Sequence, residues 1–193
     1  MDINELKENI GVIKLPKELE NLIVFQNSLS DSLYFSNGFD IQMNCKDGLR
    51  YGWCDKEDFL NKLIPFASAN GSGSIYSIWI NDNNSSLDKM PIAVFGDEGG
   101  AHIVSENILQ LFHLLTYDVE ICVDENSAYF KKNNKYTESK NHKKYLTWIK
   151  ENYGLNKIEE PEKVIKNAQE KYKNDFNNWF KIYYKKWGRP YGT

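Results

Sequence analysis

The residues best suited to chemistry are carboxylates, histidines and cysteines in the middle of the chain. Asp97 and Glu98 lie between glycines and have the residue types of an acid–base pair. Adjacent residues of an extended segment point to opposite faces, however, so one substrate would not meet both side chains. No histidine or lysine close by in the sequence is placed as an obvious partner. We therefore expect a tight turn with exposed carboxylates rather than a catalytic pair.

Metal binding and nucleophilic catalysis find equally little support. His102, Glu106 and His113 are possible ligand types, but they lack the HExxH spacing that places two histidines one turn apart. Cys122 has no convincing base, and the serines lack the GxSxG elbow. The glycine- and serine-rich residues 70–74 lack the lysine of a phosphate-binding loop. The sequence thus predicts a protein that is not an enzyme and that needs no metal or cofactor.

Charge is distributed unevenly along the 193 residues. The net charge of −3 is the balance of −12 in residues 1–130 and +9 in residues 131–193. With 41% hydrophobic and 14% aromatic residues, the chain can bury a sizeable core. We predict an acidic α+β domain over residues 1–130 and a basic, amphipathic helical extension over residues 131–193 that packs on it.

The N-terminal residues and the cysteines favour an intracellular location. The first residues are acidic and polar, unlike a signal peptide, and no apolar run approaches the length of a membrane span. Cys45, Cys54 and Cys122 are an odd number and form no CxxC pair. We expect a cytoplasmic protein with reduced thiols and no membrane contact.

Hydrophobic periodicity and turn signals predict the elements. A helix should begin after Pro16. Asn37-Gly38 and Asp47-Gly48 are hairpin signals that predict a meander of three strands, followed by a short helix over residues 55–63. Further strands are expected at residues 74–80, 91–95, 102–104 and 120–123, with a helix after Ser105. The strands of the meander are expected at residues 33–36, 39–43 and 49–53.

Two helices are predicted near the C-terminus, at residues 145–154 and 161–187. In the second, apolar and aromatic residues recur every three or four positions, and lysines mostly occupy the other faces. This pattern favours docking on the acidic body. The alternative is nucleic-acid binding through lysine–phosphate contacts and aromatic stacking, and a membrane-surface helix ranks third.

Three stretches, in this order, resemble the SUKH superfamily, which includes yeast cell-wall regulators and many bacterial immunity proteins. They are NGSGSIYSIWI at residues 70–80, PIAVFGDEGG at residues 91–100 and IVSENILQLFHLL at residues 103–115. The resemblance implies an α+β fold with helices packed against a single curved, mostly antiparallel sheet. It also implies a mainly structural role for the residues that match its motif, which include Trp79, Gly96, Gly99 and Gly100.

The resemblance implies a non-catalytic role as well, because bacterial members typically bind and neutralise a cognate polymorphic toxin, often a nuclease. A nuclease is basic where it binds phosphates, so an acidic inhibitor gains association rate and complementarity. We expect the partner-binding carboxylates to gather around one edge of the sheet, and Asp118, Glu120, Asp124 and Glu125 to extend them. The expected binding set is Asp82, Asp88, Asp97, Glu98 and Glu106.

Two other functions stay open at this point. The first is an intracellular regulatory or scaffold module of the same fold, in the manner of the eukaryotic relatives. The second is nucleic-acid binding by the basic C-terminal helices.

Overall fold

The computed structural model describes residues 1–11, 14–30, 34–81, 86–131 and 136–187, with residues 184–187 described by their backbone alone. Its helices are α1 (Ile3–Ile10), α2 (Lys17–Asn27), α3 (Cys45–Gly52), α4 (Glu57–Leu60), α5 (Ile108–Leu115), α6 (His142–Tyr153) and α7 (Pro161–Trp187), and η1 (Leu87–Lys89) is a 3-10 turn. Its strands are β1 (Asp40–Ile41), β2 (Leu63–Ser68), β3 (Ile75–Trp79), β4 (Ile92–Phe95), β5 (Ala101–Ser105), β6 (Ile121–Val123) and β7 (Ala128–Phe130). Within these ranges, each helix is too short or too polar to cross a membrane.

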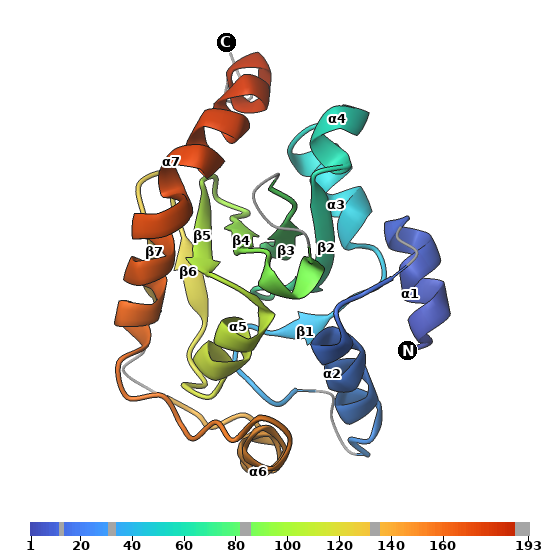
Figure 1. Ribbon diagram of the computed structural model, residues 1–193, viewed down its shortest axis with the longest axis vertical. Coiled ribbons are helices and arrows are strands. Elements are labelled where there is room, and N and C mark those ends of the chain that lie inside the picture. Colours follow the sequence, from blue (N-terminus) through green and yellow to red (C-terminus); the bar gives the residue numbers. More distant parts are fainter. Residues whose placement is uncertain (12–13, 31–33, 82–85, 132–135, 188–193) are drawn as a thin grey trace.

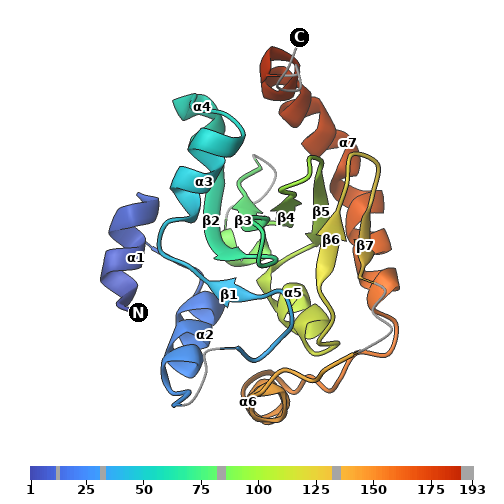
Figure 2. The same ribbon diagram turned by 180° about the vertical axis from the view of Figure 1, so that it is seen from behind.

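The main sheet is antiparallel and follows chain order, β1-β2-β3-β4-β5. Strands β6 and β7 pair separately as a hairpin that lies alongside β5 and α7 (Figure 1, Figure 2). The predicted α+β class with an antiparallel sheet is therefore confirmed. The additional two-stranded sheet is the feature that shapes the candidate site.

The main sheet is buried on both faces, and alternate residues of its strands belong to two different cores. In β3, Tyr76 and Ile78 belong to a first core, which includes residues of α1, α2, α5 and α6. Ile75 and Trp79 belong to a second core with α3, α4 and α7. Successive side chains of a strand point to opposite faces, so this alternation accommodates helices on both sides of the sheet.

Helix α7 packs along β5 with its aromatic face (Figure 1). Phe176 meets the ring of Trp79 edge to face, with 5.2 Å between the ring centroids. The side-chain amide of Gln169 donates to the carbonyl oxygen of Ile103 at 3.2 Å, which covers part of the outer edge of β5. The C-terminal helix thus contributes directly to the core of the sheet.

The predicted meander is wrong. Residues 49–53 overlap α3, and the expected strand at 39–43 is reduced to the two residues of β1. Residues 34–36 form no strand, and Leu33 lies outside the described residues. Tertiary packing overrides the local turn signal, because Cys45 and Leu49 lie one helical turn apart and both face the second core.

Gly48 explains why the Asp47-Gly48 pair is misleading. A Cβ atom at this position would come within 2.6 Å of Ile75 Cδ1. The glycine therefore allows α3 to lie close to β3, instead of forming a hairpin turn.

The predicted helix over residues 55–63 is also too long. It is reduced to α4, and β2 begins at Leu63. Pro65 lies within β2 beside an irregularity in the register between Pro65 and Ala67. Strand β1 pairs only with Ala67 and Ser68, so the missing N–H of Pro65 interrupts no ladder there.

Candidate partner-binding surface

The turn between β4 and β5 forms a glycine seat for the β6–β7 hairpin. A Cβ atom on Gly100 would lie 1.9 Å from the carbonyl oxygen of Asp124, and Gly100 has a φ of +79°. A Cβ atom on Gly96 would lie 2.5 Å from Val123 Cγ2. The imidazole Nε2 of His102 also lies 2.8 Å from the Asp124 carbonyl oxygen. Side chains larger than hydrogen at the two glycines would push the hairpin away.

Trp79 lies on the face of the sheet that packs against α7. Its side chain is 4% exposed and packs against Phe176 and against Trp179, whose ring centroid is 5.7 Å away. This position joins β3 to α7 through aromatic contacts.

Asp97 joins two turns that are distant in sequence. Its Oδ1 accepts hydrogen bonds from Ser74 Oγ at 2.5 Å and from Asn70 Nδ2 at 2.7 Å. Asn70 Oδ1 in turn accepts from the backbone N–H groups of residues 72–74. These bonds fix the turn at residues 70–74 against the β4–β5 turn.

The same bonds determine the charge of Asp97. Partial desolvation raises the pKa of its carboxyl, but the hydrogen bonds from Ser74 and Asn70 outweigh that effect and lower the pKa to about 2. Asp97 is therefore a permanent negative charge at physiological pH.

A hollow of about 670 Å³ lies beside these turns, and we call it the outer hollow. Cys122 and Tyr129 are paired across the β6–β7 hairpin, and both line it. Tyr129 is 45% exposed. The charged side chains that line the outer hollow are Asp97, Glu98, Glu120 and Lys131.

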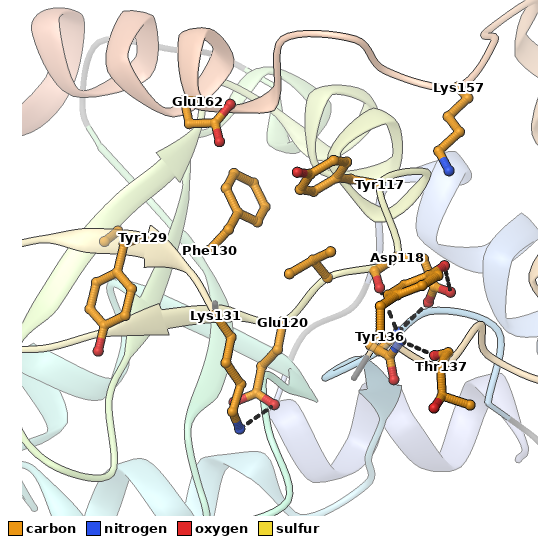
Figure 3. Close-up of a pocket in the computed structure, with 13 residues that line it drawn as sticks. Tyr117, Asp118, Glu120, Tyr129, Phe130, Lys131, Tyr136, Thr137, Lys157 and Glu162 are labelled. Carbon is orange, nitrogen blue, oxygen red and sulfur yellow. Dashed lines mark hydrogen bonds and ion pairs between the residues drawn. The ribbon is translucent and has the colours of Figure 1, made fainter. Parts of the chain in front are cut away.

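A second hollow of about 780 Å³, the inner hollow, lies between the hairpin, the start of α7 and the segment before β6. In Figure 3, the rings of Tyr117 and Phe130 face its middle, and Tyr129 stands apart from both. Glu120 and Lys131 line both hollows. The Lys131 Nζ atom lies 3.1 Å from Glu120 Oε2, and this ion pair borders both spaces (Figure 3).

Asp118 is a buried hub beside the inner hollow. Its side chain is fully buried, and it is the non-glycine residue with positive φ, +59°, among those described. Its carboxylate accepts from the backbone N–H of Asn37, the hydroxyl of Tyr136, and both the backbone N–H and the hydroxyl of Ser139, at 2.6–2.8 Å. This carboxylate therefore orders three segments of chain rather than facing a partner.

His142 lies next to this hub and is also fully buried. Its Nδ1 atom is 2.9 Å from the carbonyl oxygen of Phe35, and its Nε2 atom is 3.1 Å from that of Thr116. Nδ1 is also 3.9 Å from Asp118 Oδ1. Two acceptors thus face the two ring nitrogens, an arrangement that ties α6 to the body of the fold.

The carboxylates expected at one edge of the sheet are separated. Asp88 lies in η1 before β4, where it accepts from Ser86, and Glu106 follows β5, where its Oε2 pairs with Lys171 Nζ at 2.6 Å. Because β4 and β5 are antiparallel, these two lie at the end of the β4–β5 hairpin opposite Asp97. Glu98 stays beside Asp97, whereas Asp82 lies outside the described residues.

Glu120, Asp124 and Glu125, which were expected to extend the set, lie beside Asp97 and Glu98. Asp124 and Glu125 lie at the tip of the β6–β7 hairpin, next to the β4–β5 turn. A Cβ atom on Gly99, whose φ is +97°, would lie only 3.8 Å from Glu125 Cγ. Hydrogen bonds from the backbone N–H groups of residues 126 and 127 lower the pKa of Asp124. We call the surface formed by Asp97, Glu98, Glu120, Asp124, Glu125 and Tyr129 the acidic surface.

Tyr129 is the member of this surface that the sequence did not indicate. Strand β7 has only three residues, which is too short for alternation to be recognised. The turn-forming residues Asp124 to Ser127 directly after the predicted strand at 120–123 are the signal from which a hairpin can be inferred.

Desolvation shifts the pKa values of Cys122, His102 and His113. Desolvation, followed by the charge of Glu120, raises the pKa of Cys122 to about 11, so the thiol is protonated at neutral pH. Burial lowers the pKa of both His102 and His113. Among the described residues, no three histidine, cysteine or acidic side chains converge as a metal site would require.

The chain was also compared with known proteins. Comparisons with family models, with curated proteins and with solved structures found no match.

Proposed function

We propose that this protein is a non-catalytic immunity protein that binds and neutralises a basic protein toxin, a nuclease, through the acidic surface. The observation that carries the proposal is the convergence of carboxylates from the β4–β5 turn and the β6–β7 hairpin around the outer hollow. The lysine that lines this hollow, Lys131, is already paired with Glu120. The surface is therefore negative and concave.

Such a surface suits a partner that itself binds nucleic acid. A nuclease carries positive charge where it contacts phosphates, and opposite charge on an inhibitor steers their encounter. Electrostatic steering raises association rates from about 10⁵–10⁶ to about 10⁸–10⁹ M⁻¹s⁻¹ at low salt. The three SUKH-like stretches described above point to the same class of function.

The packing of α7 favours a protein partner over direct nucleic-acid binding. Its aromatic residues Tyr172, Phe176 and Phe180 are buried in the second core, where bases cannot stack on them. Several of its lysines are paired with carboxylates, among them Lys166 with Glu170. The regulatory or scaffold role remains the alternative, and a pull-down that recovers several endogenous partners would favour it.

Co-expression with the product of the adjacent gene tests the proposal. Wild-type protein should restore growth of cells that produce the toxin, and the double variant Glu98→Lys/Glu125→Lys should not. Glu8→Lys is a matched control, because Glu8 is an exposed carboxylate on α1, on the side of the molecule opposite the hairpin (Figure 1, Figure 2). A neighbouring product that is harmless, or toxicity that persists beside the wild-type protein, would refute the immunity function.

A further inference from the structure

The outward face of the β6–β7 sheet carries an uncovered aromatic ring. Ile121 and Val123 are buried, whereas Tyr129 is exposed and lines the outer hollow together with its cross-strand partner Cys122. No described ring stacks on Tyr129, which is 45% exposed. A large exposed aromatic residue beside a concave surface is the usual composition of an interface anchor.

Tyr129 lies near two carboxylates, Asp124 and Glu98, and near the cation Lys131. Desolvation by its neighbours, with smaller effects of Cys122, Asp124 and Glu98, raises the pKa of its hydroxyl, so the ring remains neutral at physiological pH. Glu98 is exposed and has no hydrogen bond or ion pair with any described residue. Its carboxylate can therefore accept from an incoming donor at little cost.

We infer that this face, centred on Tyr129, receives an arginine side chain of a basic protein partner. A guanidinium group is planar, so it can lie on the tyrosine ring while its N–H groups donate to Glu98. A lysine ammonium is more strongly hydrated and cannot form the forked contact with a carboxylate. The neighbouring cation, Lys131, does not occupy this role, because its Nζ atom is within 3.2 Å of both Glu120 oxygens.

The face is also held in position before any partner arrives. The glycine seat fixes the hairpin on the β4–β5 turn, and the hydrogen bonds of Asp97 fix that turn to residues 70–74. A surface that is already ordered loses less conformational entropy on binding. Arginine recognition at this face rests on the proposed function, since it specifies the chemistry by which the toxin is recognised.

Arginine recognition can be tested without the toxin. The probe is N-acetyl-arginine methylamide, titrated into the full chain while NMR shifts are recorded. We expect saturable shifts at residues 96–99, 122 and 129, weaker binding of the lysine analogue, and no such shifts with the citrulline analogue, which has the same shape without the charge. Equal binding of citrulline and arginine, or the absence of a saturable shift, would overturn the inference.

Substitutions test how much the Tyr129 ring itself contributes to arginine binding. Tyr129→Leu should weaken arginine binding about two- to fivefold, the range expected for an exposed cation–π contact, whereas Tyr129→Phe should keep it. Tyr51→Leu is the control, because Tyr51 is 77% exposed but lies on α3. Arginine binding that Tyr129→Leu leaves unchanged would contradict the role of the ring.

The two proposals can fail separately. Arginine binding at this face without neutralisation in the co-expression test would refute the immunity function and leave the inference standing. Neutralisation without arginine binding would refute the inference and leave the immunity function standing.

Discussion

Asp118 and Asp97 both belong to the acidic part of the chain, yet they serve different ends. Asp118 is fully buried, with four hydrogen-bond donors around its carboxylate. Asp97 is exposed and lines the outer hollow, although its carboxylate also accepts bonds from Ser74 and Asn70. Equal charges in a sequence can thus build the fold, border a surface, or do both.

The other carboxylates also differ in whether they are paired within the protein or exposed. Glu106 is paired with Lys171, and Glu120 is paired with Lys131, so their charges are largely neutralised within the protein. Glu98 is exposed without a described partner. The charge available to a binding partner is therefore smaller and more localised than the net −12 of residues 1–130 suggests.

The largest effect on the free energy of unfolding is expected at the buried carboxylate, Asp118. Asp118→Ala should lower the free energy of unfolding by about 3–5 kcal/mol, because four hydrogen-bond donors around a fully buried side chain lose their acceptor. Asp118→Asn tolerates the positive φ but places an amide N–H₂ among these donors, so it should also destabilise the protein. Urea denaturation measures both. A loss below about 1 kcal/mol would show that the carboxylate does not order the segments around it.

The second largest loss of stability is expected at the glycine seat, formed by Gly96 and Gly100. Gly100→Ala should cost about 2–3 kcal/mol, since its Cβ atom would overlap the carbonyl of Asp124 and its φ is positive. Gly71→Ala is the control, because no atom lies within 4 Å of the added Cβ atom. Thermal unfolding and hydrogen exchange at β6 and β7 should report the difference. If both variants behave alike, the seat does not hold the hairpin.

A smaller effect should distinguish Asp97 by its pH dependence. Its pKa is about 2 in the folded protein and has an ordinary value of 3.8, so its charge stabilises the fold above about pH 4. That contribution is lost as the pH falls toward 2. Asp97→Asn should lower stability by less than about 1 kcal/mol at neutral pH, because the site is exposed. The gap between the two proteins in thermal scans should close below about pH 2 to 3. A gap that is constant with pH would contradict this.

The smallest effect on stability is expected for the exposed carboxylates. Glu98→Lys/Glu125→Lys should change the free energy of unfolding by less than about 0.5 kcal/mol, yet slow association with the toxin. Stopped-flow measurements at increasing salt should show a weaker salt dependence for this variant than for Glu8→Lys. Equal rates for the two would place the partner elsewhere on the molecule.

Strongly periodic segments were predicted well from the sequence. The helix after Pro16, the strands near residues 74–80 and 91–95, and the long C-terminal helix correspond to α2, β3, β4 and α7. Their hydrophobic spacing is a local property that survives in the folded chain. The meander failed because Gly48, which looks like a turn residue, instead allows a helix to approach β3.

The candidate site was predicted only in part. Asp97, Glu98, Glu120, Asp124 and Glu125 were expected together, but they were grouped with Asp88 and Glu106, which lie at the other end of the β4–β5 hairpin. Tyr129 was missed because β7 is too short to be recognised. Neither distance along the chain nor charge indicates which acidic residues meet in space.

The mixed α+β class, the aromatic face of α7 and the glycine-rich turn after β4 follow from the sequence alone, because each depends on residues close together in the chain. Which carboxylates are buried, paired or exposed depends instead on how distant segments of the chain pack together. That outcome depends on a hairpin more than twenty residues downstream packing on Gly96 and Gly100, and burial is set by such long-range contacts.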